Sequence, residues 1–160
     1  MIVFTTIDSP VGPLLLAADA DGLRLIEFSE PRHPVNRGTQ WQEGSHPTLD
    51  ATRTQLDEYF AGRRTGFDLP LSPQGTLFQR DIWAALAQIP YGQTVTYGDM
   101  ASRAGHPGAV RAVGAAVGRN PVPIVVPCHR VVGADGSMTG FSGGLPVKRQ
   151  LLLLEGAVPA

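Results

Sequence analysis

The sequence predicts an α+β fold of two lobes, residues 1–75 and 76–160, on three observations. Short apolar runs separated by turn residues fill the first half, whereas helical periodicity fills the second half. A patch of proline, glycine and serine at 70–75 lies between them and is typical of a linker. At 160 residues the chain is long enough for one domain, or for two small lobes that share a core.

Short apolar runs in the first lobe predict an antiparallel hairpin or meander. Turn-forming residues separate three of these runs, at 2–7, 11–18 and 23–28. Residues 29–47 are rich in proline, glycine, histidine and polar side chains, which predicts a surface loop. A helix is predicted over 48–61, because apolar residues recur there near a 3.6-residue period.

Helical periodicity dominates the second lobe. A first helix is predicted to end near Gln88, and two short helices follow at 97–104 and 108–118. A turn with glycine joins the short pair, which is typical of a helix-turn-helix but equally of helix hairpins that bind no DNA. Residues 122–126 are then predicted to form a buried strand, and 147–155 a helix whose four consecutive leucines should be enclosed.

Cys128 is the single cysteine of the chain, and it follows Pro127 and the apolar stretch 123–126. A lone thiol forms no internal disulfide and rarely supports a structural zinc site, so it is either an inert buried thiol or a reactive one. His129 and Arg130 come next, and positive or proton-accepting neighbours draw a thiol toward thiolate. The sequence therefore favours a nucleophilic cysteine.

His129 and Glu155 are the candidates to activate that thiol. A carboxylate can orient an imidazole, which then takes the thiol proton directly or through water. Each residue also has an ordinary alternative. His129 would be a core histidine bonded to backbone, and Glu155 an exposed residue at a helix end that Gly156 caps.

Four other features have both a functional and a structural interpretation. The second short helix is rich in alanine and glycine, and Arg111 either projects from this smooth face to a ligand or is simply solvated. Gly114 costs roughly 1 kcal/mol relative to alanine inside a helix, which implies an offsetting contact. Tyr97 is either core or a phosphate contact, and Asn120 can be a left-handed helix cap. The glycine-rich loop 140–144 either admits a ligand to its backbone or is a flexible connector.

Charge is unevenly distributed along the chain. Residues 1–75 hold six arginines and ten acidic residues (6 − 10 = −4), whereas 76–160 hold six arginines and one lysine against four acidic residues (7 − 4 = +3). This asymmetry indicates contact between the second half and a polyanion, or a chance fluctuation in small counts. No stretch approaches the roughly 20 apolar residues of a membrane span, and no export signal is recognisable, so we expect a cytoplasmic protein without membrane contact.

Taken together, the motifs of residues 76–160 resemble the O6-alkylguanine-DNA alkyltransferases, also called methylated-DNA–protein-cysteine methyltransferases. Five elements carry the resemblance, in the right order and at close spacing: Arg111-Ala112-Val113-Gly114, Asn120-Pro121, Pro127-Cys128-His129-Arg130-Val131, Ser142-Gly143-Gly144, and the Leu-Leu-x-x-Glu-Gly run at 151–156. Residues 1–75 fit this family more loosely, as its variable N-terminal lobe.

The resemblance implies a ribonuclease-H-like sheet in the N-terminal lobe and a winged-helix-like helix-turn-helix in the C-terminal lobe. Residues 76–160 would then form the DNA-binding and alkyl-transfer domain. Some members carry zinc in or before the N-terminal lobe, which a chain with one cysteine cannot reproduce. We therefore expect no metal site and no cofactor.

The implied function is DNA repair by direct damage reversal. A methyl or other alkyl group would pass irreversibly from O6-alkylguanine, and from O4-alkylthymine, to Cys128 after base flipping, so that each molecule acts once. The implied partner is double-stranded DNA, contacted in the minor groove. We expect the free protein to be a monomer, and the sequence leaves cooperative binding open.

The family pattern also implies a role for each site residue. Cys128 would be the nucleophile, His129 and Glu155 its proton relay, and Asn120 the hinge between the helix-turn-helix and the cysteine. The others would contact DNA or the base: Arg111, Ala112, Gly114 and Ala115 on the second helix, and Tyr97, Val131, Ser142 and Phe141 around the base. Phe141 stands where members usually have tyrosine, which removes one hydroxyl near the pocket.

More specific contacts follow from the same resemblance. Arg111 would fill the gap left by the flipped nucleotide, while Tyr97 would contact the 3′ phosphate and donate to the purine N3. The carbonyls of Cys128 and Val131 would accept from the exocyclic amine, and the Ser142 N–H would donate to the alkylated oxygen.

Three other functions compete with this interpretation. Alkyltransferase-like proteins bind alkylated DNA without transfer, but they have tryptophan in place of the reactive cysteine, so Cys128 argues against them. A cysteine hydrolase would need an oxyanion hole and turnover through an acyl-enzyme. A plain helix-turn-helix regulator would keep its role without Cys128.

Overall fold

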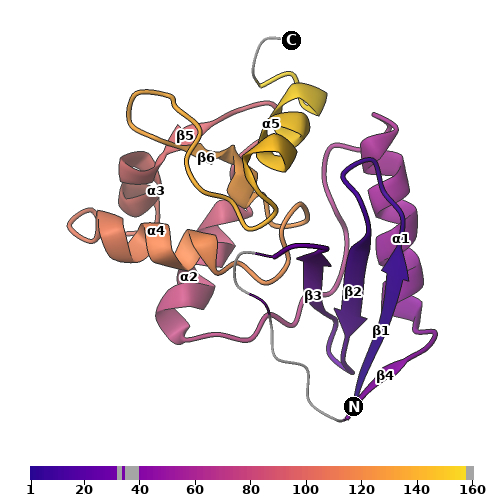
Figure 1. Cartoon of the computed structure of the whole chain (residues 1–160). Helices are drawn as coiled ribbons and strands as arrows, with labels where there is room; N and C mark the ends of the chain where they lie inside the picture. Colours follow the sequence, from indigo (N-terminus) through magenta and orange to yellow (C-terminus); the bar gives the residue numbers. More distant parts are fainter. Residues whose placement is uncertain (32–33, 35–39, 158–160) are drawn as a thin grey trace.

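The computed structural model describes residues 1–31, 34 and 40–157, and it has the expected α+β architecture, a sheet lobe beside a helical lobe (Figure 1). Residues 32–33 and 35–39 of the predicted surface loop lie outside the described residues. Buried apolar side chains of both lobes form one continuous cluster, so the lobes share a core.

The N-terminal lobe is a four-stranded sheet with one helix packed on it (Figure 1). Its elements are β1 (Ile2–Ile7), β2 (Leu14–Ala18), β3 (Leu23–Phe28), β4 (Trp41–Glu43) and α1 (Pro47–Phe60). The strand order is β3-β2-β1-β4, in which β1, β2 and β3 form the predicted antiparallel meander and β4 pairs in parallel with β1. Leu49, Leu56 and Tyr59 are buried on α1, which contacts β1, β2 and β3.

The surface loop predicted over 29–47 is wrong at its C-terminal end. Residues 41–43 form β4, whose pairing runs from Ile2 opposite Trp41 to Phe4 opposite Glu43, and Pro47 opens α1. A three-residue edge strand is too short to show the alternation by which strands are recognised in a sequence.

The predicted linker at 70–75 is bound to the edge of the sheet. The Leu23 N–H donates to the Pro70 carbonyl at 2.8 Å, and the Ser72 N–H donates to the Leu23 carbonyl at 2.8 Å. Gly22, at φ +153°, permits this approach, because a Cβ there would lie 2.5 Å from the Pro70 carbonyl carbon. The crossover between the lobes is therefore held in place and is no free hinge.

The C-terminal lobe is built from helices around a minimal parallel strand pair. Its elements are α2 (Leu77–Leu86), β5 (Val95–Thr96), α3 (Tyr97–Arg103), α4 (Val110–Gly118), the 3-10 turn η1 (Cys128–Arg130), β6 (Val131–Val132) and α5 (Leu145–Leu154). The short helices α3 and α4 pack on each other and on α2, in the helix-turn-helix arrangement that the sequence predicts (Figure 1). Because β5 pairs with β6, the start of α3 lies beside the residues that follow the cysteine.

The buried strand predicted over 122–126 is wrong. These residues are buried or half-buried, but the chain turns back on itself, with Pro123 bridged to Val126 and Ile124 at φ +73°. The Val126 N–H donates to the Val122 carbonyl at 3.0 Å, which closes the turn. Pro121 and Pro123 lack the N–H groups of a strand ladder, and this explains why an apolar run fails to pair here.

Only part of the leucine run in the last helix, α5, is buried. Leu151 and Leu152 are fully buried, whereas Leu153 is 36% exposed, so the prediction of an enclosed run is wrong there. Successive helical residues point about 100° apart, and four in a row must therefore include one that faces outward. Lys148, one turn before Leu152, lies in the core instead. Neither α5 nor any other helix of the described segments has the length and apolarity to cross a bilayer.

Candidate active site

Cys128 opens the 3-10 turn η1, and 6% of the residue is exposed. Its N–H donates to the Val126 carbonyl at 2.8 Å. Burial raises the pKa of the Cys128 thiol to about 11, against the opposing effects of the Asn120 side chain and the charge of Lys148. The resting thiol is therefore protonated at neutral pH, and its proton must leave as the sulfur reacts.

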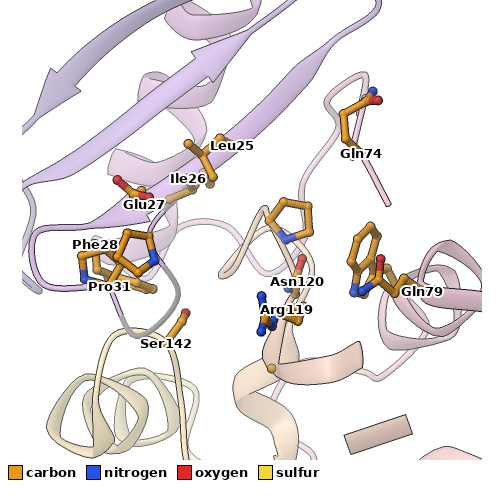
Figure 2. A pocket seen from close by; sticks show the side chains of 14 residues that line it. Leu25, Ile26, Glu27, Phe28, Pro31, Gln74, Gln79, Arg119, Asn120 and Ser142 are labelled. Atoms are coloured by element: carbon orange, nitrogen blue, oxygen red, sulfur yellow. The ribbon is translucent and has the colours of Figure 1, made fainter. Parts of the chain in front are cut away.

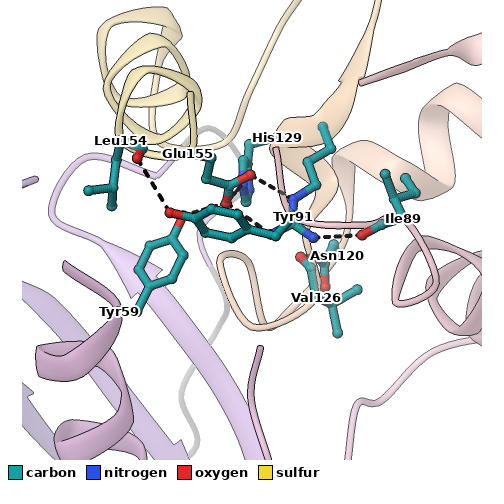
Figure 3. Close-up of polar contacts among 9 residues, drawn as sticks. Tyr59, Ile89, Tyr91, Asn120, Val126, His129, Leu154 and Glu155 are labelled. Carbon is teal, nitrogen blue, oxygen red and sulfur yellow. Dashed lines mark hydrogen bonds and ion pairs between the residues drawn. The ribbon is translucent and has the colours of Figure 1, made fainter. Parts of the chain in front are cut away.

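Glu155 is the common acceptor of a buried hydrogen-bond network next to that turn (Figure 3). Its two carboxylate oxygens accept from His129 Nε2 at 2.7 Å, from Arg130 Nε at 2.8 Å and Nη2 at 2.9 Å, and from the Tyr59 hydroxyl at 2.6 Å. Burial by itself would raise the pKa of Glu155, but the hydrogen bonds from His129 and Arg130 lower it to about 2. Glu155 is therefore an anion at neutral pH and acts only as an acceptor.

This network fixes the protonation of His129. Since Glu155 can only accept, Nε2 of His129 carries the hydrogen, an assignment that follows from the hydrogen-bond partners. Nδ1 is buried without a hydrogen-bond partner among the described residues. Burial lowers the pKa of His129, although the bond to Glu155 opposes that effect. The imidazole is thus neutral at neutral pH and presents a free lone pair at Nδ1.

The structure brings His129 and Glu155 together, and it directs Arg130 to this carboxylate rather than to the sulfur of Cys128. Besides Glu155, the guanidinium of Arg130 donates to the Ile89 carbonyl at 2.6 Å, so three of its hydrogen bonds are committed to these two partners. The expectation that Arg130 draws the thiol toward thiolate is therefore wrong, because its charge neutralises the carboxylate. The cation that acts on the sulfur is Lys148, which the sequence analysis passed over.

Asn120 connects the end of α4 to the turn that precedes Cys128 (Figure 3). Its side-chain amide donates to the Val126 carbonyl at 2.8 Å, and its side-chain oxygen accepts from the Val122 N–H at 3.1 Å. The φ angle of Asn120 is not positive, so the left-handed helix cap considered above is wrong. The side chain instead holds together the turn that the sequence suggested to be a strand.

The α4 helix presents a smooth exposed face. Arg111, Ala112 and Ala115 are exposed, whereas Gly114 is half-buried. A Cβ at Gly114 would lie 3.5 Å from the Tyr97 ring, an ordinary contact distance. Gly114 therefore packs on Tyr97 beside the exposed face rather than forming part of it. On the opposite side, the indole N–H of Trp83 donates to the Ala116 carbonyl at 2.8 Å and ties α4 to α2.

A cavity of about 540 Å³ lies between α4 and the loop that leads to α5. The predicted site residues among its lining are Tyr97, Arg111, Gly114, Ala115, Phe141 and Ser142. The Tyr97 hydroxyl accepts from Thr139 Oγ1 at 2.9 Å, which leaves its own proton free for a ligand. Phe141 turns its ring edge-on to Phe28 of β3, with 5.5 Å between the centroids, and is buried.

The two backbone carbonyls assigned to the base already have protein donors. The Val131 carbonyl accepts from Lys148 Nζ at 2.7 Å, and the Cys128 carbonyl accepts from the Val131 N–H. A carbonyl oxygen has two lone pairs, so each can accept a second hydrogen bond from a ligand. Lys148 is 1% exposed and also reaches the Thr139 carbonyl at 3.3 Å, so it joins β6 to the loop beside the cavity.

A second, smaller cavity of about 250 Å³ lies between β3 and the end of α4 (Figure 2). Phe28, Arg119, Asn120 and Ser142 line it, and Ser142 also lines the first cavity. Within the described residues, no three or more histidine, cysteine, aspartate or glutamate side chains gather as metal ligands would.

Sequence reasoning missed Tyr59 and Lys148 as parts of this site. Tyr59 has the helical spacing of a core residue, and its partner Glu155 lies 96 positions away. Lys148 is a charged residue on the buried side of α5, which its helical phase with Leu152 could have indicated.

Comparison with known proteins identifies the family. Residues 2–73 match the ribonuclease-like domain of 6-O-methylguanine DNA methyltransferase, and residues 77–157 match its DNA binding domain. A methylated-DNA–protein-cysteine methyltransferase of Methanosarcina acetivorans is 47% identical over 154 residues, which cover 96% of this chain and 98% of the relative. The protein of the same name from Mycobacterium tuberculosis is 48% identical over 155 residues, with 97% and 93% covered.

A solved structure agrees with these matches. Mycobacterium tuberculosis OGT, crystallised in complex with DNA, is similar with a TM-score of 0.90 and 47% identity, covering 96% of this chain and 92% of that one. Fold and site define a helix-turn-helix protein with a buried cysteine next to a histidine–carboxylate pair. The chain belongs to the 6-O-methylguanine DNA methyltransferase family.

Proposed function

We propose that this protein repairs DNA by direct reversal of damage. It transfers a methyl or other alkyl group from O6-alkylguanine, and also from O4-alkylthymine, irreversibly to Cys128. The observation that carries this proposal is the neutral His129, whose Nε2–H is held by Glu155 while Nδ1 is free to accept a proton. Such an imidazole, adjacent in sequence to a protonated thiol, suits a reaction in which the proton leaves as the sulfur attacks.

The reaction is a single displacement at carbon. The bond from Cys128 Sγ to the alkyl carbon forms as the bond from that carbon to O6 breaks. The thiol proton passes to His129 Nδ1 directly or through water, and a proton returns from His129 through water to the departing guanine, so that thiol and alkylated guanine become thioether and guanine. Hydrogen bonds from the Tyr97 hydroxyl to N3 and from the Ser142 N–H to O6 stabilise the leaving base, and the carbonyls of Cys128 and Val131 hold its exocyclic amine. A thioether has no route back to the thiol, so each molecule acts once and needs no cofactor.

The DNA partner is a duplex that carries the alkylated base, and α4 enters its minor groove. Small exposed side chains at Ala112 and Ala115 let the helix backbone approach a narrow groove closely. Arg111 occupies the gap left by the flipped nucleotide, Gly114 supports Tyr97, and Tyr97 contacts the 3′ phosphate. Asn120 keeps this helix in register with the cysteine turn.

The two lobes divide this work. Residues 76–160 form the DNA-binding and alkyl-transfer domain, and residues 1–75 form an α/β lobe without zinc that packs against it. The protein acts as a cytoplasmic monomer before it meets DNA.

Intact-mass spectrometry tests the proposal directly. After incubation with a duplex oligonucleotide containing O6-methylguanine, the protein should gain one methylene unit, about 14 Da, and peptide mapping should place it on Cys128. The same duplex with unmodified guanine serves as the control. An unchanged mass after prolonged incubation would refute the proposed activity.

Arg111→Ala should separate base flipping from chemistry. Because Arg111 is exposed on α4 and stands in for the flipped nucleotide, its loss should slow methyl transfer from duplex DNA about tenfold or more. The reaction with free O6-benzylguanine, which requires no flipping, should change less than about twofold. Arg149→Ala, which removes an exposed arginine from α5, should leave both rates near wild type. Equal losses on the two substrates in Arg111→Ala would count against this role.

A further inference from the structure

One oxygen of Glu155 is shared by donors from both lobes (Figure 3). Oε2 accepts from His129 Nε2 at 2.7 Å and from the Tyr59 hydroxyl at 2.6 Å, with Arg130 Nη2 at 2.9 Å. His129 and Arg130 belong to η1 in the C-terminal lobe, whereas Tyr59 belongs to α1 in the N-terminal lobe. The N-terminal lobe therefore contacts the carboxylate that holds the histidine.

Tyr59 is held firmly in this position. It is fully buried, and its ring contacts those of Phe60, Phe67 and Tyr91, with 5.3, 5.4 and 6.3 Å between the respective centroids. Burial, together with the charge of Glu155, raises the pKa of Tyr59 far above its ordinary value, so the hydroxyl remains a donor at every pH at which the protein is usable. A full-strength donor to a buried carboxylate is a fixed part of the site.

We infer that Tyr59 is a positioning residue for alkyl transfer: through Glu155 it limits the proton affinity of His129 and orients the imidazole, so that the N-terminal lobe takes part in the chemistry. The inference rests on the proposed function. Nothing in it requires Tyr59 to touch DNA, the base or the sulfur.

The physical reason lies in how a carboxylate divides its negative charge. Each hydrogen bond to Oε2 draws charge away from His129 Nε2 and weakens the attraction of Glu155 for an imidazolium. Without Tyr59, more of that charge acts on His129, which then retains a proton up to a higher pH. A protonated His129 cannot accept the thiol proton, so the reaction would fail at pH values where the wild type still works.

Two other charged groups act on the His129–Glu155 pair and must be held constant in any test. They are Arg130 of η1 and Lys148 of α5, whose charges act on His129. Tyr91 offers a matched control, because it is a second tyrosine of the same ring cluster. Its hydroxyl donates to the Leu154 carbonyl at 3.3 Å and not to Glu155.

The test compares Tyr59→Phe with Tyr91→Phe in the full-length protein. The rate of modification by free O6-benzylguanine is measured from about pH 5.5 to about pH 9, so that DNA binding plays no part. For Tyr59→Phe, the acid limb of the profile should move up by about one pH unit, so the loss of rate should grow toward a limit of about tenfold as the pH falls to the acid end of the range and should stay below about threefold near pH 8.5. Tyr91→Phe should keep the wild-type profile.

A second measurement follows the protonation of His129 directly. Titration of its imidazole by NMR in ¹⁵N-histidine-labelled protein should place its pKa higher in Tyr59→Phe than in the wild type. An unshifted profile with an unshifted titration, or a rate loss that is equal at every pH, would overturn the inference and leave Tyr59 a packing residue. Failure of the wild type to react with O6-benzylguanine at any pH would instead count against the proposed function.

Discussion

Replacing Cys128 with serine should abolish alkyl transfer, so that no gain of about 14 Da follows incubation with O6-methylguanine duplex. A serine hydroxyl in the same buried position is a far weaker nucleophile, and its proton is much less acidic than a thiol proton, so the imidazole of His129 cannot remove it effectively. Cys128 is also the only sulfur nucleophile in the chain, so no second residue can take over the reaction.

The same variant should still bind DNA. Cys128 is 6% exposed and lies on η1, while the exposed face proposed to meet DNA belongs to α4. Affinity for alkylated duplex, measured by fluorescence anisotropy, should stay within about threefold of wild type, since a shift of that size is below 1 kcal/mol. Methyl transfer to serine, or an equal loss of binding and transfer, would contradict the separate placement of the sulfur and the helix.

Replacing Glu155 with glutamine should cause the largest loss of stability, about 3–5 kcal/mol. The change leaves the buried charge of Arg130 without its carboxylate and turns an amide N–H₂ toward groups that are themselves donors. Chemical denaturation at neutral pH measures this loss. Glu58→Gln, which breaks a partly exposed ion pair with Arg64, is the control and should cost less than about 1 kcal/mol.

The pH dependence of stability should reveal the same carboxylate. The pKa of Glu155 is about 2 in the folded protein against an ordinary value of 4.5. The ionised carboxylate therefore stabilises the folded state at pH values above 4.5. That contribution, about 3 kcal/mol, should be lost as the pH falls from about 5 to about 2. Glu155→Gln should lack this component of the acid transition. An identical acid dependence in the two proteins would show that Glu155 is not the group that titrates.

Local sequence pattern was sufficient to predict the helices and strands that surround the site. β1 to β3 are short apolar runs separated by turn residues, and α1, α3 and α4 have recognisable periods and breaks, so each could be predicted without knowledge of its neighbours. Cys128, His129 and Glu155 were found because cysteine, histidine and an acid suggest a proton relay and because their motifs resemble a known family. The structure brings the last two into contact at 2.7 Å.

What could not be predicted depends on contacts between distant segments. An apolar run such as 122–126 is compatible with a strand until Asn120 is seen to satisfy its backbone groups from the side. The sequence pattern around Tyr59 is the same for a core tyrosine as for one whose hydroxyl donates to Glu155. Whether Arg130 acts on the sulfur or on the carboxylate is likewise decided by geometry, not by its place next to His129.

Burial of the cysteine has a consequence for the lifetime of the unreacted protein in the cell. Burial raises the pKa of the Cys128 thiol to about 11, so the thiolate is a small minority at pH 7. Peroxide, glutathione disulfide and stray electrophiles all react with the thiolate, which attacks them, and 6% exposure of Cys128 gives them little access to the sulfur. A protein consumed by its first reaction can therefore persist in reserve until a lesion arrives.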